Sequence, residues 1–198
     1  RAPGIRLRVV VRERQFFGRR VVELDAEGTS TIDQAVDALG HVPLPPYIHR
    51  IDDETDRERY QTVFAQARGS VAAPTAGLHF TADLIDTLRA RGVRWGTVTH
   101  HVGYGTFKPV RVATVEEHSV DREHYEIGAA TADLVSSARG AGGRVIAVGT
   151  TTTRALESAA IHGRLVRPGR ASTELFIHPG YQFQAVDALL TNFHLPKS

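Results

Sequence analysis

The chain has 198 residues, of which 41% are hydrophobic and 23% charged, and its formal net charge is +2. This balance is ordinary for a globular domain, and no apolar run approaches the roughly 20 residues that a membrane-spanning helix requires. Cysteine is absent, which excludes disulfides, thiolate metal sites and thiol nucleophiles.

Methionine is also absent, so we expect the sequence to be a piece of a longer protein. All basic residues except Lys108 and Lys197 are arginine. Arginine suits phosphate recognition, although a genome-wide preference for arginine codons is the better explanation for most of the excess. The charge therefore permits a nucleic-acid partner without demonstrating one.

The N-terminal residues predict a hairpin followed by a helix. Apolar residues alternate with arginines from Ile5 to Val11, and the segment RRVVEL follows Gly18. Such alternation on both sides of a turn is typical of antiparallel strands. Residues 31–40 then predict a short helix with a capping box from Thr31 to Gln34.

The segment from Gly40 to Asp56 contains three prolines and predicts a rigid loop. Beyond it, expected helices and strands alternate. We expect helices over residues 81–92, 131–143 and 150–160 and a short one from 186, and strands over 93–103, 144–149 and 173–180. This order favours an α/β fold with a mixed or mostly parallel sheet flanked by helices. Residues 1–40 would form a small β-rich subdomain and residues 41–198 the α/β catalytic domain.

The segment VIAVGTTTTRALESAA predicts a buried strand that ends at Gly149, followed by a helix opened by threonines. Backbone N–H groups at such a turn favour anionic ligands. Arg154 could neutralise a carboxylate or phosphate there, with Glu157 orienting it. The alternative is that the threonines only cap the helix while Arg154 and Glu157 form a surface pair.

Two further segments combine glycine with histidine. In HHVGYGTFKPV, Gly103 and Gly105 would let the backbone approach a ligand, and His100 and His101 point to opposite faces of a strand. In PTAGLHFT, Thr75, Gly77 and His79 precede a helix capped by Thr81. Taken singly, an ordinary turn and a buried loop are the better explanations of these two segments.

The charged run EEHSVDREHYE favours a solvated face, and its spacing does not match an H-E-x-x-H zinc site, so we expect no metal. The sequence also lacks a Walker loop, a G-x-S-x-G elbow and a dinucleotide-binding G-x-G-x-x-G.

Together, longer segments carry a resemblance to a known family. These are GHVPLPPYI, DRERYQTVFA, GSVAAPTAGLHFT, HVGYGTFKPVRV, EEHSVDREHYEI, RVIAVGTTTTRALESAA and LFIHPGYQFQAVDALLTNFHLPKS. In this order, from about Gly40 to Ser198, they resemble the S-adenosylmethionine:tRNA ribosyltransferase-isomerase family of queuosine biosynthesis.

The resemblance implies a cytoplasmic enzyme with an α/β domain and an inserted β-barrel, to which residues 1–40 would contribute. It implies transfer and isomerisation of the ribosyl part of S-adenosylmethionine onto 7-aminomethyl-7-deazaguanine in tRNA, giving epoxyqueuosine-tRNA, adenine and methionine. S-adenosylmethionine is thus consumed as a substrate, and no metal is implied. We expect a monomer.

Such a reaction requires a base near the sulfonium and a proton donor for the departing adenine, and histidine suits both tasks. As catalytic residues we predict His79, His101 and His194. As residues that bind S-adenosylmethionine we predict Thr75, Gly77, Gly103, Gly105, Thr106, Thr150, Thr151 and Arg154. Asn192 would read a base edge, Phe107 and Tyr125 would stack on substrate, and Lys108 would meet tRNA phosphates. The loops that carry His79, Gly103, Thr150 and Asn192 should therefore converge.

The chain departs from the family pattern at Val120 and Asp121, where family members usually carry Met-His. Two alternatives stay open, the first of them motivated by this replacement. One is a tRNA- or nucleotide-binding relative with impaired turnover, and the other is an enzyme that uses S-adenosylmethionine on a free deazapurine nucleoside.

Overall fold

The computed structural model describes residues 4–15, 20–45, 47–103, 112, 114–162 and 164–194. The chain divides into two compact units, Arg1–Val42 and Pro43–Ser198.

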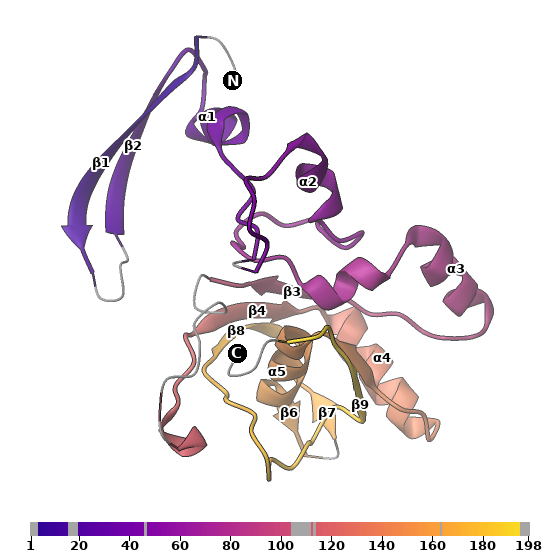
Figure 1. Ribbon diagram of the computed structural model, residues 1–198. Helices are drawn as coiled ribbons and strands as arrows, with labels where there is room; N and C mark the ends of the chain where they lie inside the picture. Colours follow the sequence, from indigo (N-terminus) through magenta and orange to yellow (C-terminus); the bar gives the residue numbers. More distant parts are fainter. Residues whose placement is uncertain are drawn as a thin grey trace. The chain divides into compact units, whose positions relative to one another are not determined.

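In the first unit, the described residues form a hairpin and one helix (Figure 1). Strand β1 (Arg6–Arg14) pairs antiparallel with β2 (Arg20–Glu27), and helix α1 (Ile32–Leu39) follows. The predicted hairpin and helix are confirmed. Thr31 Oγ1 accepts from the Gln34 N–H, as expected, but the side-chain Oε1 of Gln34 accepts from the Ser30 N–H at 3.2 Å, so the reciprocal half of the capping box shifts by one residue.

The two faces of this hairpin differ in polarity. On one face, Arg8 donates to Asp25 at 3.0 Å and Arg12 donates through Nε to Glu23 at 2.6 Å. On the other face, Val9 and Val11 are about half exposed. The described part of residues 1–40 does not by itself close a barrel, so the β-barrel subdomain stays a prediction.

Among its described residues, the second unit has three small sheets (Figure 1). The largest is antiparallel, with β4 (Glu123–Ile127) between β3 (Val98–His101) and β8 (Gly169–Thr173). Strands β5 (Ile146–Val148) and β9 (Ala188–Leu190) pair in parallel, and β6 (Ala160–Ile161) pairs antiparallel with β7 (Leu165–Val166). A mixed α/β fold is confirmed. A mostly parallel sheet is not, since β5 and β9 are the only parallel pair among the described residues.

The helices of this unit are short. They are α2 (Glu54–Arg59), the 3-10 helix η2 (Thr75–His79), α3 (Ala82–Ala90), the 3-10 turn η4 (Val115–Glu117), α4 (Ala129–Gly140) and α5 (Thr150–Ser158). Thr81 caps α3 as predicted, since its Oγ1 accepts from the Leu84 N–H. Helix α2 was not expected, because the loop was predicted to continue to Asp56. The prolines lie before the helix, and a capping box of Asp53 and Asp56 starts it within the predicted loop.

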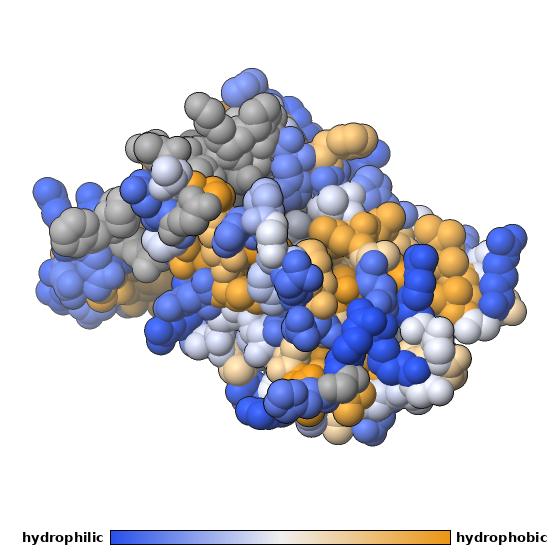
Figure 2. Space-filling view, turned by 90° about the horizontal axis from the view of Figure 1, so that it is seen from below, coloured by the Kyte–Doolittle hydropathy of each residue, from blue (hydrophilic) through white to orange (hydrophobic). Residues whose placement is uncertain are grey.

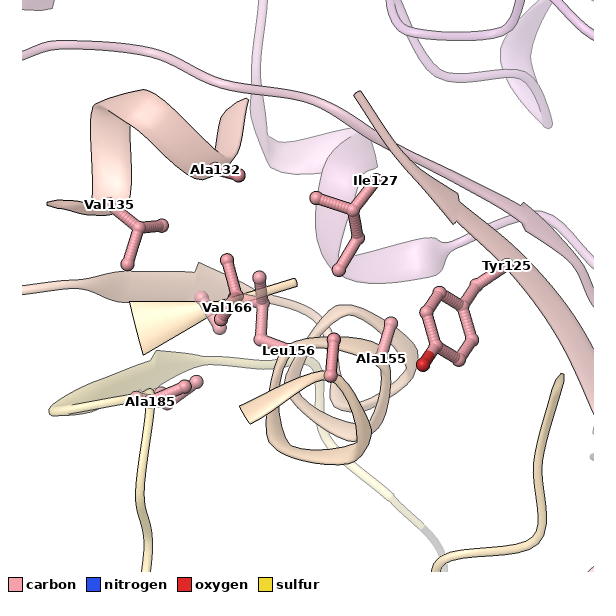
Figure 3. Close-up of a cluster of buried hydrophobic side chains, with 11 residues drawn as sticks. Tyr125, Ile127, Ala132, Val135, Ala155, Leu156, Val166 and Ala185 are labelled. Carbon is pink, nitrogen blue, oxygen red and sulfur yellow. The ribbon is translucent and has the colours of Figure 1, made fainter. Parts of the chain in front are cut away.

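The hydrophobic core lies between the inner face of the antiparallel sheet and helices α4 and α5 (Figure 3). Ile127 is 1% exposed, and Tyr125 faces Ala155 and Leu156 of α5. On β4, alternate residues point inward, so this face of the sheet is tied to α5. The arrangement fixes the N-terminal turn of α5 relative to β3 and β4.

Two predicted elements near the C-terminus are wrong. The strand expected over 173–180 lies instead at Gly169–Thr173, an exposed edge strand whose polar residues give no apolar alternation. The helix expected from 186 is strand β9, because pairing with β5 decides the structure of a segment whose three apolar residues, Ala188–Leu190, are ambiguous by themselves.

The charged run that favoured a solvated face contains the central strand β4. Glu123 at its start is 6% exposed. Its burial is possible because Arg154 from α5 pairs with it. The sequence around Glu123 does not reveal that partner.

Strand β9 is anchored by Asp187, whose side chain is 15% exposed. Asp187 accepts from the Val145 N–H at 2.7 Å and from Arg164 at 2.6 Å, and Arg139 lies 2.5 Å away. Burial acts to raise the pKa of Asp187, but these three donors outweigh it and lower the pKa to about 2. The ionised carboxylate therefore stabilises the fold.

We expect Asp187→Asn to lower the free energy of unfolding at pH 7 by about 2 kcal/mol, since hydrogen bonds to a charged group are lost. A folded-state pKa below the unfolded one gives stability that is complete above about pH 4 and is lost as the pH falls towards 2. The difference between wild type and variant should thus shrink over this interval in urea titrations. A difference that stays constant from pH 7 to pH 2 would contradict this role of Asp187.

On the face drawn in Figure 2, hydrophobic residues form several separate groups with hydrophilic residues between them. Within the described ranges, every helix is too short or too polar to cross a bilayer.

Candidate functional site

The outer face of the antiparallel sheet carries an open hollow with a volume of about 590 Å³. Residues paired across an antiparallel ladder point to the same face, and the register aligns His101 with His124 and Glu126 with Arg170. The hollow is lined at alternate positions of the three strands by Thr99, His101, His124, Glu126, Arg170 and Ser172, and also by Tyr125, Ala171 and Ala67. It is polar and contains two imidazoles.

The segment Gly69–Val71 supports His101 from the side. Ser70 Oγ donates to the His100 carbonyl at 2.9 Å and accepts from the Val102 N–H at 3.1 Å, and the Val71 N–H donates to the Val102 carbonyl at 2.9 Å. Gly69 has φ +133°, and a Cβ placed there would lie 2.6 Å from His101 Nδ1. Only glycine allows this close approach to the imidazole.

We expect Gly69→Ala to displace the His101 imidazole and to cost about 1–3 kcal/mol of stability, because a strained φ and a steric clash coincide. Histidine NMR resonances and chemical unfolding would measure the two effects. Gly92→Ala is the matched control, since Gly92 has φ +83° but open space around its Cβ position. The control should lose stability through strain without moving the His101 resonances, and equal spectra for the two variants would refute the proposed clash.

His124 was not among the predicted site residues. It lies directly opposite His101 and is exposed in the hollow, next to the ion pair of Arg170 and Glu126 at 2.8 Å. Its alternation with buried Glu123 and Tyr125 was the available signal. The surrounding charges concealed it, because they favoured a solvated face over a central strand.

On the inner face of the sheet, Arg154 is held by two acceptors. Its Nε donates to the Leu175 carbonyl at 3.0 Å, and its Nη1 donates to Glu123 Oε2 at 2.8 Å. The proposed partner Glu157 is engaged elsewhere, with Tyr181 and with the N–H groups of residues 184–186. Neither the orienting role of Glu157 nor its surface pair with Arg154 is correct.

His100 shares this inner face, as its alternation with His101 predicted. Burial, reinforced by the charges of Arg154 and His101, lowers the pKa of His100 to about 4, so the imidazole is neutral near pH 7. Burial also raises the pKa of Glu123, and the interaction with Arg154 only partly offsets this rise. Among the described residues, His100 Nε2 and Arg154 Nη2 are buried without a hydrogen-bond partner.

Three of the predicted loops meet around Gly149. The Gly149 N–H donates to the Leu190 carbonyl at 2.8 Å, and a Cβ placed on Gly149 would lie 3.9 Å from the Ala76 methyl group. The start of α5 with Thr150 and Thr151 therefore adjoins η2 and the end of β9, two residues before Asn192. Gly103 follows β3, whose end is bound to Gly69–Val71.

Within η2, the predicted residues differ in their surroundings. A Cβ on Gly77 would lie 2.9 Å from a methyl group of Thr62, so close packing against Thr62 accounts for this glycine. His79 ends the helix and is exposed, while Thr75 begins it and is half-buried. His79 is thus available to a ligand, although it lies on a different element from the hollow.

The remaining predicted residues fall into three groups. Asn192 Oδ1 accepts from the Phe193 N–H at 2.9 Å, and the exposed His194 lies 3.4 Å from Thr191 Oγ1. Tyr125 is 6% exposed and belongs to the core, while it also borders the hollow, so its stacking on substrate stays a prediction. Outside the described residues lie Gly105, Thr106, Phe107 and Lys108.

Among the side chains that the structure describes, no three histidine, aspartate or glutamate residues gather as a metal site would require. Arg154 and the threonines at the start of α5 offer N–H groups and hydroxyls. Such groups are suited to an anionic or oxygen-rich organic ligand.

Comparison with known proteins relates this arrangement to a family. The model of the queuosine biosynthesis protein family matches residues 3–198. A relative from Xylella fastidiosa (strain M12), named S-adenosylmethionine:tRNA ribosyltransferase-isomerase, is 55% identical over 190 residues, which are 96% of this chain and 53% of the relative. A relative of the same name from Geobacter metallireducens is 59% identical over 84% of this chain and 48% of its own length.

Among solved structures, an S-adenosylmethionine tRNA ribosyltransferase from Thermotoga maritima is 29% identical, with a TM-score of 0.47 over 97% of this chain and 48% of that one. The chain spans about half the length of the curated relatives it matches. Because the family model covers nearly every residue, the chain belongs to the queuosine biosynthesis protein family.

Proposed function

We propose that the chain is part of an S-adenosylmethionine:tRNA ribosyltransferase-isomerase. The observation that carries this proposal is the identity of 55–59% to relatives of that name over most of the chain. The enzyme would transfer the ribosyl part of S-adenosylmethionine to 7-aminomethyl-7-deazaguanine in tRNA and isomerise it, releasing adenine and methionine. The cytoplasmic location and the monomeric state stay predictions.

The hollow offers a site for the acid–base steps. His101 is half-buried, supported by Gly69, and faces an open space large enough for part of a nucleoside. A neutral imidazole there could take the proton next to the sulfonium, and an imidazolium could protonate adenine as it leaves. We retain His101 as the first candidate. His79 and His194 are the others, since His79 is exposed at the end of η2 and His194 is exposed on the segment after β9.

Binding of S-adenosylmethionine would involve the start of α5. Thr150 and Thr151 lie in its first turn, where N–H groups favour a carboxylate or the oxygens of a ribose. Thr75 and Gly103 lie on the adjoining segments, and Asn192 follows β9. The predicted contributions of Gly105, Thr106, Phe107 and Lys108 lie outside the described residues and stay predictions.

The proposal is tested by incubating the intact protein with S-adenosylmethionine and tRNA that carries the deazaguanine precursor. We expect release of adenine that depends on the tRNA, together with epoxyqueuosine in the nucleoside digest. Retention of tRNA on a filter without any adenine would instead indicate a binding protein, for which Asp121 is the motivation. Equal reaction of the free deazapurine nucleoside would indicate the other alternative, an enzyme that uses S-adenosylmethionine on such a nucleoside without tRNA.

A further inference from the structure

Two N–H-bearing groups on different elements lack an acceptor in the same region. Arg154 Nη2 comes from α5 and His100 Nε2 from β3, and both atoms are buried without a partner among the described residues. Buried polar groups of folded proteins are almost always hydrogen-bonded. The two groups are close enough for the charge of Arg154 to lower the pKa of His100. Within the described part of the chain they therefore lack a hydrogen-bond acceptor, which another molecule could supply.

The direction of Arg154 Nη2 is fixed by the rest of the guanidinium. Nε is bound to the Leu175 carbonyl and Nη1 to Glu123, in an ion pair whose side chains are 15% and 8% exposed. Because the guanidinium is planar, fixing two of its nitrogens aims the third. The anchors come from β4 and from the segment after β8, so three elements contribute to this orientation.

The chemistry of the missing acceptor follows from its donors. A guanidinium N–H binds carboxylate oxygens more strongly than neutral acceptors, and a neutral imidazole adds a donor when Nε2 carries its proton. Arg154 lies in the second turn of α5, and the first turn of this helix adds the positive end of the helix dipole. A carboxylate fits these groups better than a base edge or a hydroxyl does.

We propose that Glu123 is a positioning residue, which holds Arg154 so that its Nη2 binds the carboxylate of the amino-acid part of S-adenosylmethionine. This inference rests on the proposed function and adds Glu123 and His100 to the site. A water molecule bound between Arg154 and His100 would satisfy the same donors and would make the pair purely structural. The two occupants predict different ligand preferences.

The experiment compares two probes with the intact protein by titration calorimetry. S-adenosylhomocysteine keeps the carboxylate, whereas 5′-methylthioadenosine lacks the whole amino-acid part. We expect Glu123→Gln to weaken binding of S-adenosylhomocysteine by about tenfold or more, because a freed guanidinium loses its orientation. Binding of 5′-methylthioadenosine should change by less than about twofold, so the preference of the protein for the carboxylate-bearing probe should fall.

Asp187→Asn is the matched control. It breaks an ion pair with Arg139 whose side chains are 15% and 13% exposed, close to those of Glu123 and Arg154. The control should lower the melting temperature while leaving the affinities for both probes unchanged, which separates positioning from loss of stability. A Glu123→Gln variant that keeps the wild-type preference, or that loses affinity for both probes equally, would overturn the inference in favour of a structural pair. Wild-type protein that binds neither probe would overturn the proposed function itself.

Discussion

Replacing His101 with alanine is expected to lower the rate of adenine release by about a hundredfold or more, as the loss of a general acid or base does. His101 is the one predicted catalytic histidine that faces the hollow; the segment Gly69–Val71 is hydrogen-bonded to its neighbours His100 and Val102, and Gly69 lies close to its imidazole. The measurement is single-turnover adenine release with precursor-bearing tRNA. Single-turnover conditions separate the chemical step from product release.

The matched control is His162→Ala, since His162 is an exposed histidine in the turn between β6 and β7. It should release adenine at the wild-type rate. Near-normal release by His101→Ala would remove His101 from the catalytic residues and would direct attention to His79 or to His124 across the strand pair. Loss of tRNA retention together with loss of release would indicate a role in binding.

The sequence predicted those parts of the fold whose signals are local. The hairpin follows from the alternation after Ile5, and helix α3 follows from its cap at Thr81 and its amphipathic pattern. The opposite orientations of His100 and His101 follow from the period of a strand. Each of these features depends on residues that are close together in the chain.

The parts that were missed depend on distant partners. Strand β9 is apolar over too few residues to distinguish strand from helix, and only its pairing with β5 decides. Glu123 is buried because Arg154, 31 residues later, compensates its charge. Glu157 was assigned to Arg154 on helical spacing, whereas its actual partners lie 24 to 29 residues away.

The arrangement of the loops around the candidate site could likewise be predicted only in part. The adjacency of η2, the Gly149 turn and the end of β9 could be expected, since ligand-binding loops gather at the carboxyl ends of parallel strands such as β5 and β9. The hollow on the outer face could not, because it requires the register of three antiparallel strands. His124 and Arg170 enter the site only through that register.

Glu157→Ala is expected to lower the free energy of unfolding by about 3–5 kcal/mol, because it leaves several buried donors without an acceptor. Glu157 is 5% exposed. Its Oε1 accepts from the N–H groups of Ala185 and Val186 at 2.9 and 2.8 Å, and its Oε2 accepts from the Gln184 N–H at 2.8 Å and from the Tyr181 hydroxyl. One carboxylate thus holds the segment that leads into β9.

Chemical unfolding of the intact protein measures the change, with Glu174→Ala as the matched control. Glu174 pairs with Arg122 on the surface, both side chains being more than half exposed, and such pairs contribute about 0–1 kcal/mol.

A spectroscopic signature accompanies Glu157→Gln, which keeps the size of the side chain and removes its charge. Burial, with the adjacent Glu157, raises the pKa of Tyr181 to about 12, so the variant should ionise this phenol at lower pH in tyrosinate absorbance. Equal unfolding free energies for Glu157→Ala and Glu174→Ala would show that the segment before β9 holds its place without the carboxylate.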